Sequence, residues 1–329
     1  GPIRSAALAI ALAPTLALTL GPSLAAGPPV AAGGAAPASA EVRLLHRDHP
    51  LAGRIWSTRD ARFVPDVEVL AAAGRARFVM LGERHGNPEH HALQARVVAA
   101  AADGRALAVV AEQLDFAQQP AIDACRRDCA DFGTELGHRV GWAQTGWPAY
   151  ALYAPVFEAA ARAGAAVLAG NPGAARVRTL SRGEPATADE TWAAAAREPL
   201  SASGRARLVQ DLVDGHCGHL PAERAEPLVS AQRLRDAAMA ATLVRGAGVD
   251  GGAVLIAGNG HVRRDYGVPT LLRRADTLVI GFVEVAAGKV APADYAAADA
   301  FDYLWFTARV DEPDPCEQFR EQLRKLAPR

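Results

Sequence analysis

Residues 81–88 read Leu81-Gly82-Glu83-Arg84-His85-Gly86-Asn87-Pro88, and this stretch decides the fold. An apolar run, 78–81, leads into it, and a helix-like segment, 89–102, follows, so it stands where a strand ends and a helix begins. The turn carries an acid, a guanidinium and an imidazole at consecutive positions. A second apolar run, 254–257, leads into Gly258-Asn259-Gly260-His261. The chain therefore contains two Gly-x-x-His motifs, each directly after a predicted strand.

Working outward, further apolar runs alternate with helix-like segments. These runs do not alternate with polar residues, which is typical of strands buried on both faces. We predict an α/β fold with a mostly parallel sheet flanked by helices on both faces. A helical insertion at about 186–246 should lie over one end of the sheet, and 41–51 should hold an edge strand. The predicted strands are 76–81, 106–111, 165–169, 253–257, 277–285 and 303–310, and the predicted helices are 60–73, 89–102, 149–163 and 269–274.

Length and charge narrow the class of protein. The chain has 329 residues, with 35 basic and 36 acidic residues and a net charge of -1. This balance gives no indication of a nucleic-acid partner. The glycines after 257 do not complete a G-x-G-x-x-G dinucleotide motif, and no Gly-x-Ser-x-Gly nucleophile elbow is present, which argues against an ordinary serine hydrolase.

The first 40 residues read as a signal peptide and flexible leader. Arg4 precedes a largely apolar run, Ala6 to Leu20, and small-residue cleavage sites follow at Ser23-Leu24-Ala25 or Ala38-Ser39-Ala40. No Cys lies near either site, so membrane anchoring is not indicated. We expect a periplasmic or otherwise exported protein whose single domain covers 41–329.

Four cysteines fit an exported protein. If all are paired, three connectivities are possible, and the sequence does not choose among them. Cys125 and Cys129 are close enough for a local bridge, in which case Cys217 would pair with Cys316. A metal site built on cysteines is the weaker alternative, because two of the four are isolated.

Polar residues at the strand ends should meet on one rim, because ligands of parallel sheets bind beyond the carboxyl ends of the strands. Glu83, His85, Glu112 and His261 form a plausible ligand set for a divalent metal such as Zn, Mn or Fe, which could activate water. Without a metal, Glu83 could act as a general base and His261 as an acid. Asn171 should lie on the same rim. The competing interpretation is a buried ion-pair network that only closes the sheet.

Aromatic residues between 142 and 153 either fill the core or line a flat apolar slot. Tyr is known as a ligand of haem iron, and Arg side chains suit haem propionates. On the predicted helix 89–102, His90 and His91 point about 100° apart, so only one can face the rim fully.

At these residues the chain resembles the ChaN-like haem-binding uptake proteins of the Tiki superfamily. The matching pieces run in order through most of the chain after the leader. They are LGERHGNPEHHALQ, AEQ, GWPAYALYAPVFEAA, AGN, QRLRDAAMA, IAGNGHVRRDYGVP and FDYLWFTARVDEPDPC. The resemblance implies export, a role in haem and iron uptake, and haem held between two subunits by Tyr and His. It thus implies a homodimer, with outer-membrane haem-uptake machinery as a further partner.

The resemblance leaves the haem contacts and the activity open. The wider superfamily includes metal-dependent proteases and erythromycin-esterase-like enzymes. A metal-dependent hydrolase using Glu83, His85, Glu112 and His261 is therefore the alternative function. The candidate haem contacts are Arg84, His90, Tyr150, Tyr153, Arg263 and Tyr266.

Overall fold

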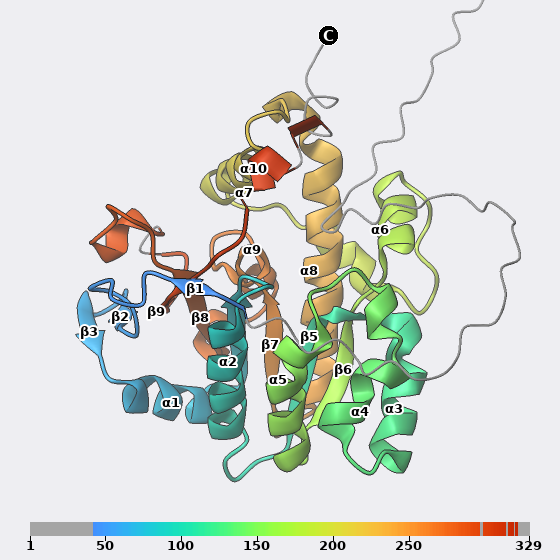
Figure 1. Ribbon diagram of the computed structural model, residues 1–329. Coiled ribbons are helices and arrows are strands. Elements are labelled where there is room, and N and C mark those ends of the chain that lie inside the picture. Colours follow the sequence, from blue (N-terminus) through green and yellow to red (C-terminus); the bar gives the residue numbers. More distant parts are fainter. Residues whose placement is uncertain (1–41, 297–298, 314, 319, 322–329) are drawn as a thin grey trace, which may run out of the picture.

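A central sheet organises the chain, which a computed structural model describes except for residues 1–41, 297–298, 314, 319 and 322–329 (Figure 1). The predicted leader, 1–40, lies outside the described residues. The strand order is β3-β2-β9-β8-β4-β7-β5-β6. The strands are β2 (Ile55–Ser57), β3 (Arg62–Val64), β4 (Phe78–Glu83), β5 (Leu107–Asp115), β6 (Ala166–Asn171), β7 (Gly252–Gly258), β8 (Thr277–Glu284) and β9 (Tyr303–Thr307).

The strands from β9 to β6 in this order are all parallel, and the hairpin of β2 and β3 adds antiparallel strands at one edge. β4 pairs with both β7 and β8, so the two strands that carry the Gly-x-x-His motifs are neighbours. Glu83 and Gly258 are opposite each other in that pairing. The predicted mostly parallel α/β sheet is confirmed.

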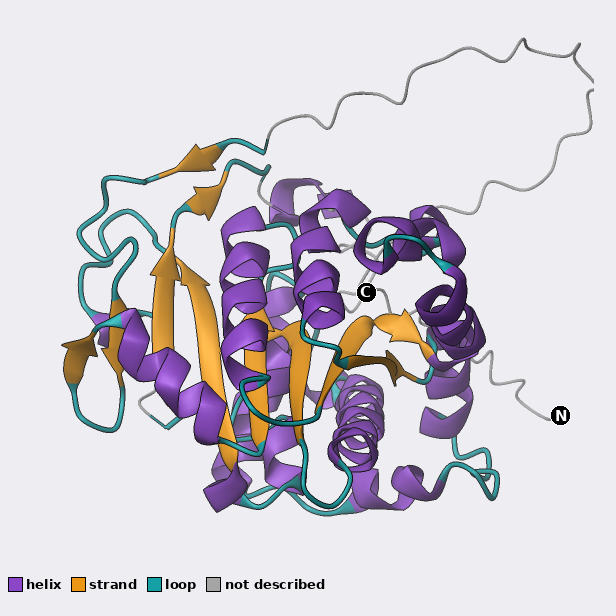
Figure 2. Ribbon diagram, turned by 90° about the horizontal axis from the view of Figure 1, so that it is seen from below, coloured by secondary structure: helices purple, strands orange, loops and turns teal. Residues whose placement is uncertain are grey.

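Helices cover both faces of this sheet, as the view from below shows (Figure 2). The α-helices are α1 (Asp66–Arg75), α2 (Pro88–Ala101), α3 (Gln119–Asp128), α4 (Phe132–Arg139), α5 (Tyr150–Arg162), α6 (Ala174–Ser181), α7 (Ala202–Gly215), α8 (Glu226–Ala247), α9 (Asn259–Val262) and α10 (Pro315–Gln318). Short 3-10 helices are Phe116–Gln118, Trp142–Gln144, Thr191–Arg197, Ala222–Arg224, Val268–Leu271, Arg274–Asp276 and Pro292–Asp294.

The period-two geometry of the strands divides the core into two layers. On β4, Val79 and Leu81 join the layer that contains α2 and α5, whereas Met80 joins the layer that contains α8. All three side chains are fully buried. This explains the continuous apolar runs in the sequence, because each strand must present an apolar residue to both layers.

Two boundaries in the first part of the chain differ from the prediction. The helix predicted at 60–73 begins only at Asp66, because residues 62–64 form β3 and pair with β2. The edge strand predicted at 41–51 reduces to Leu44–Leu45 (β1), which pairs with Arg309–Val310 (β10) in a separate two-stranded sheet. The aromatic pair Trp56 and Phe63, at 4.9 Å between ring centroids, holds the hairpin together. Its strands are too short to form a long apolar run in the sequence.

The segment 186–246 contains helices and no strand among its residues, as predicted. Its second half, however, is not confined to one end of the sheet. α8 packs along β5, β6 and β7 and forms the main cover of one face. It is the last helix of the connection between β6 and β7. The short helix predicted at 269–274 is present as two 3-10 turns.

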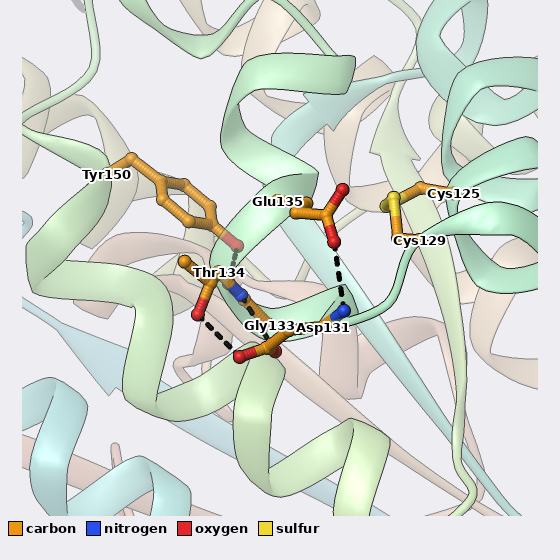
Figure 3. Close-up of a disulfide and its surroundings, with 7 residues drawn as sticks. All are labelled: Cys125, Cys129, Asp131, Gly133, Thr134, Glu135 and Tyr150. Atoms are coloured by element: carbon orange, nitrogen blue, oxygen red, sulfur yellow. Dashed lines mark hydrogen bonds between the residues drawn. A yellow bond between two sulfur atoms is a disulfide. The ribbon is translucent and has the colours of Figure 1, made fainter.

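Of the three possible connectivities, the structure contains the one with a local bridge, and all four cysteines are paired. Cys125 and Cys129 bridge the C-terminal end of α3 (Figure 3), and Cys217 and Cys316 join the end of α7 to α10. Within the described ranges, no helix combines the length and the apolar character needed to cross a bilayer.

Candidate functional site

Glu83, the last residue of β4, is the centre of a buried polar cluster. Its Oε1 accepts hydrogen bonds from the Tyr153 hydroxyl at 2.7 Å, the Gln113 amide at 2.9 Å and His85 Nδ1 at 2.8 Å. Its Oε2 accepts one from the Gln94 amide at 2.7 Å. The carboxylate side chain is fully buried, and a buried charge of this kind persists only when such bonds satisfy it.

The two histidines of α2 face different sides, as the 100° turn between neighbours requires. His91 lies 3.4 Å from Glu83 Oε2 and hydrogen-bonds the His85 carbonyl through Nε2. Burial lowers the pKa of His91, but the Glu83 charge outweighs it, so the pKa is raised. His90 instead accepts the Arg84 backbone N–H at Nδ1 and contacts Thr307 at Nε2. Burial lowers the pKa of His90 to about 3, so this ring is neutral.

The same charges act on Glu83. Burial alone would raise the pKa of Glu83, but the neighbouring imidazoles of His91 and His85 hold it well below its usual range. Glu83 is therefore a carboxylate near neutral pH. The cluster combines an anion with two imidazoles rather than a neutral network.

A second buried chain of ionisable groups starts from β5. Glu112 accepts the Gly258 backbone N–H at 2.8 Å through Oε2 and lies 3.3 Å from His261 Nε2 through Oε1. His261 Nδ1 contacts Asp236 of α8 at 2.6 Å and Gln232 at 3.0 Å. The imidazole of α9 is thus held between two acids.

This arrangement sets the charge states of Glu112 and His261. Burial lowers the pKa of His261, but Glu112 and Asp236 more than offset it and raise it to about 10. Burial raises the pKa of Glu112, yet His261 brings it down to about 2. Glu112 and His261 are consequently a permanent ion pair near neutral pH.

The two Gly-x-x-His motifs meet at His85. A Cβ on Gly258 would lie 3.2 Å from His85 Nε2 and 3.7 Å from Glu112 Oε2, so the imidazole lies almost against the Gly258 backbone. Gly82 is required for the same reason, because a Cβ there would come within 2.2 Å of the Asn259 side chain. The two glycines let two strand ends carry side chains that touch. The structure therefore brings Glu83, His85, Glu112 and His261 together at the carboxyl ends of neighbouring strands.

The predicted metal site has no support in this geometry. No group of three or more His, Cys, Asp or Glu residues in the described part of the chain is arranged to hold a metal ion. The reason is visible at Glu83, where Tyr153, Gln113, His85 and Gln94 already occupy the carboxylate oxygens. Glu112 is likewise taken by Gly258 and His261.

Of the three tyrosines proposed as haem contacts, Tyr153 and Tyr266 are buried and Tyr150 is partly buried, and all three hydroxyls are engaged. Tyr153 donates to Glu83, Tyr266 donates to Asp211 at 2.7 Å, and Tyr150 donates to the Gly133 carbonyl (Figure 3). Burial raises the pKa of all three phenols. In this conformation none presents a free phenolate.

The two predicted propionate contacts are paired as well. Arg84 lies 3.4 Å from Glu284 and donates to Glu312 at 2.9 Å. Arg263 is almost fully buried and binds both carboxylate oxygens of Asp265. Asn171, at the end of β6, donates to the Glu112 carbonyl and accepts the Gly173 backbone N–H. It therefore shapes the strand end and does not project a free amide.

Sequence reasoning missed the contributions of α8. Gln232 and Asp236 bind His261, and the neighbouring Arg235 is buried close enough to Glu112 and Asp236 to feel their charges. These residues lie in QRLRDAAMA, a segment that the resemblance covers but that is remote from every strand end. A signal was available, because polar residues inside an otherwise buried helix need partners.

Trp147 completes the exposed part of the rim. Its indole packs edge-on against the His85 ring, at 4.8 Å between centroids. His85 is the most open of the rim imidazoles, with 32% of its side chain exposed, compared with 9% for His261 and 0% for His91. The rim thus offers a basic heterocycle and a flat apolar surface side by side.

Comparison with known proteins identifies related chains. A family model described as haem-binding uptake, Tiki superfamily, ChaN, matches residues 69–272. No curated protein matches the chain. The solved structures that it resembles include that of ChaN of Campylobacter jejuni, described as showing cofacial haem binding. The TM-score is 0.59 and the identity 17%, and the match covers 76% of this chain and 95% of that one. Another is the type III effector HopBA1, with a TM-score of 0.37, 14% identity, and coverage of 78% and 97%.

Proposed function

We propose, from the premise that this chain belongs to the haem-binding uptake (ChaN) family of the Tiki superfamily, that it is an exported haem-binding protein of haem and iron uptake. The ligand cleft of this proposal lies at the carboxyl ends of β4, β5 and β7. The rim there combines charged groups with an aromatic side chain, as a haem with its propionates requires.

The observation that carries the proposal is the pair of His85 and Trp147. Haem, if bound, would supply an iron that an imidazole nitrogen can ligate. His85 Nδ1 is held by Glu83, which fixes the ring and leaves Nε2 for a ligand. Trp147 lies against that ring and offers an apolar surface to a porphyrin edge. His85 therefore fits the role better than Tyr150, Tyr153 or Tyr266, whose hydroxyls are engaged.

A haem titration followed at the Soret band tests this proposal. We expect the wild-type protein to shift the band, and His85→Ala to weaken binding by tenfold or more, since it would remove the proposed nitrogen ligand. Tyr150→Phe and Tyr266→Phe are the matched controls and should bind haem as the wild type does. A pure, folded wild-type sample with no shift would refute haem binding. A shift that survives His85→Ala but disappears in a tyrosine variant would assign the role of iron ligand to that tyrosine.

The pH dependence of binding gives a second measurement. Burial lowers the pKa of His85, but Glu83 and Glu112 outweigh it and raise the pKa above its ordinary value. An iron must compete with a proton for Nε2, so haem affinity should rise as the pH rises. Affinity that falls with rising pH would argue against an imidazole ligand.

Export belongs to the same proposal. The two disulfides support it, because such bonds persist in oxidising compartments. N-terminal sequencing of the mature protein from a periplasmic extract should place its start just after Ala25 or after Ala40. Recovery of an uncleaved chain from the cytoplasm would contradict this part.

The partners of this proposal are a second copy of the chain and outer-membrane haem-uptake machinery. ChaN of Campylobacter jejuni binds haem cofacially, and its similarity to this chain supports an arrangement in which two haems face each other. We propose that each of two subunits holds one of them. Light scattering with and without haem should detect a dimer, and haem that binds only to a monomer would refute this arrangement.

A further inference from the structure

A concave pocket of about 780 Å³ lies at the edge of the sheet opposite the rim. It is lined by Ser57 at the end of β2, Tyr303 at the start of β9 and Thr277 at the start of β8. Because β8 and β9 run parallel to β4, their first residues lie at the amino ends of the strands, whereas Glu83 lies at the carboxyl end. Arg75, the last residue of α1, forms part of the wall. This pocket shares no lining residue with the His85 cluster.

The lining of the pocket is rich in charge, with more cations than anions. The guanidinium groups are those of Arg59, Arg62, Arg75, Arg264 and Arg274, and the carboxylates are those of Asp60, Glu68 and Asp302. The whole chain has a net charge of only -1, so this excess is local. A concave surface with one dominant sign of charge focuses the field and concentrates ions of the opposite sign.

The acids of the pocket are already paired. Asp302 accepts from Arg264 Nε at 2.8 Å and from a second nitrogen of the same guanidinium. Glu68 accepts from Arg62 at 2.8 and 3.0 Å through its two oxygens. Asp60 lies 4.0 Å from Arg62 and accepts a hydrogen bond from Ser57 at 2.9 Å. These acids therefore do not neutralise the remaining arginines at contact distance.

Arg75 and Arg274 are the cations left over. Both are exposed, and neither makes an ion pair or a side-chain hydrogen bond within the described part of the chain. Asp276, close to Arg274 in sequence, pairs with Arg273 at 3.2 Å. Tyr303 also lines the pocket, and burial raises the pKa of its phenol, so it keeps a proton to donate.

We propose that this pocket binds a small oxyanion with two or more negative charges, held by the free guanidinium groups of Arg75 and Arg274. Guanidinium groups bind carboxylate and phosphate oxygens through paired hydrogen bonds, so the oxyanion can be either a carboxylate or a phosphate compound. The two unpaired cations match the two charges of such an ion. Arg264, locked by Asp302 and the Thr277 carbonyl, provides a rigid floor.

Calorimetric titration with inorganic pyrophosphate and, separately, with succinate tests the site on the full chain. We expect binding by at least one of them, and the one that binds identifies phosphate or carboxylate as the ligand class. The double variant Arg75→Ala, Arg274→Ala should weaken binding by about tenfold or more for each charge-assisted hydrogen bond that it removes. Added salt should weaken it further.

The matched control removes two exposed arginines elsewhere. Arg127→Ala combined with Arg182→Ala changes the net charge by the same amount, since both are exposed positions outside the pocket. It should leave the affinity within about twofold of wild type. No binding of either anion would overturn the proposal, and so would equal weakening in the control pair, which would indicate a diffuse ion atmosphere. All four substitutions are at exposed positions, so folding is not at stake.

Discussion

Replacing Tyr153 by Phe removes one oxygen atom from the centre of the Glu83 cluster and leaves the ring in place. The hydroxyl donates at 2.7 Å to a carboxylate, and both side chains are fully buried. A hydrogen bond to a charged group contributes about 1.5–3 kcal/mol, whereas a neutral one contributes about 1 kcal/mol. Glu83 keeps its bonds to Gln113, His85 and Gln94. The expected loss in the free energy of unfolding is therefore about 2 kcal/mol.

Tyr150→Phe is the matched control, because it lies one helical turn earlier in α5 and donates to a neutral carbonyl, that of Gly133. It should lose about 1 kcal/mol. Urea denaturation followed by tryptophan fluorescence measures both variants. A loss of about 2 kcal/mol corresponds to a fall in melting temperature of roughly 4–8 °C for a large domain.

A double-mutant cycle isolates the contact itself. Tyr153→Phe combined with Glu83→Gln should give a coupling energy of about 1–2 kcal/mol, since the two side chains are in direct contact. Tyr153→Phe that costs no more than Tyr150→Phe, together with a coupling energy near zero, would refute the assignment of Glu83 as a charged hub.

Three other features of the molecule each give a prediction. As the pH falls from 6.5 to 3, the unfolded chain takes up a proton at His90 that the native state does not, so His90 should lower the free energy of unfolding by about 1.4 kcal/mol per pH unit. Urea denaturation of His90→Gln over the same range should show a correspondingly smaller dependence of this free energy on pH. Replacing Cys217 and Cys316 by Ser releases residues that are 99 positions apart and should cost roughly 4–5 kcal/mol in the same assay, against roughly 2 for the local bridge. Gly258→Ala should displace the His85 ring and weaken haem binding in a Soret titration, with unchanged affinity contradicting the proposed ligand.

The parallel sheet could be predicted because its strands are continuous apolar runs in the sequence. β4 and β7 each end in a polar motif, and the rule that strand ends share a rim was enough to bring Glu83, His85, Glu112 and His261 together. Burial on both faces demands such runs, so the pattern survives without knowledge of the partners. The order β4-β7-β5, in which a late strand enters between two early ones, had no local signal.

The contacts within the rim could not be predicted, because they depend on side chains from helices. Whether Tyr153 would donate to Glu83 or face a ligand depends on the rotation of α5 about its axis, which the abundant Ala in that helix leaves open. Asp236 is hidden in the same way, since α8 is buried along most of its length and shows no clear polar face. The β2–β3 hairpin was missed because three-residue strands carry too few residues for a period-two pattern.

The two Gly-x-x-His motifs are similar in sequence but not in chemistry. His261 is buried between Glu112 and Asp236, so it acts as a fixed positive charge that keeps Glu112 ionised. His85 is hydrogen-bonded to one acid, Glu83, and its ring is partly exposed. Replacing His261 by Ala should therefore cost about 3–5 kcal/mol of stability, because it removes the cation that contacts both buried carboxylates.

His85→Ala should cost much less stability, since Glu83 retains Tyr153, Gln113 and Gln94. Its effect should fall on haem affinity instead. Urea denaturation and Soret titration of the two variants, measured side by side, separate the roles. Equal losses of stability would contradict the distinction, because two equivalent imidazoles would then be holding the rim together. Repetition of a motif therefore fixes where its side chains meet, while the number of acids in direct contact with each imidazole decides which one remains available to a ligand.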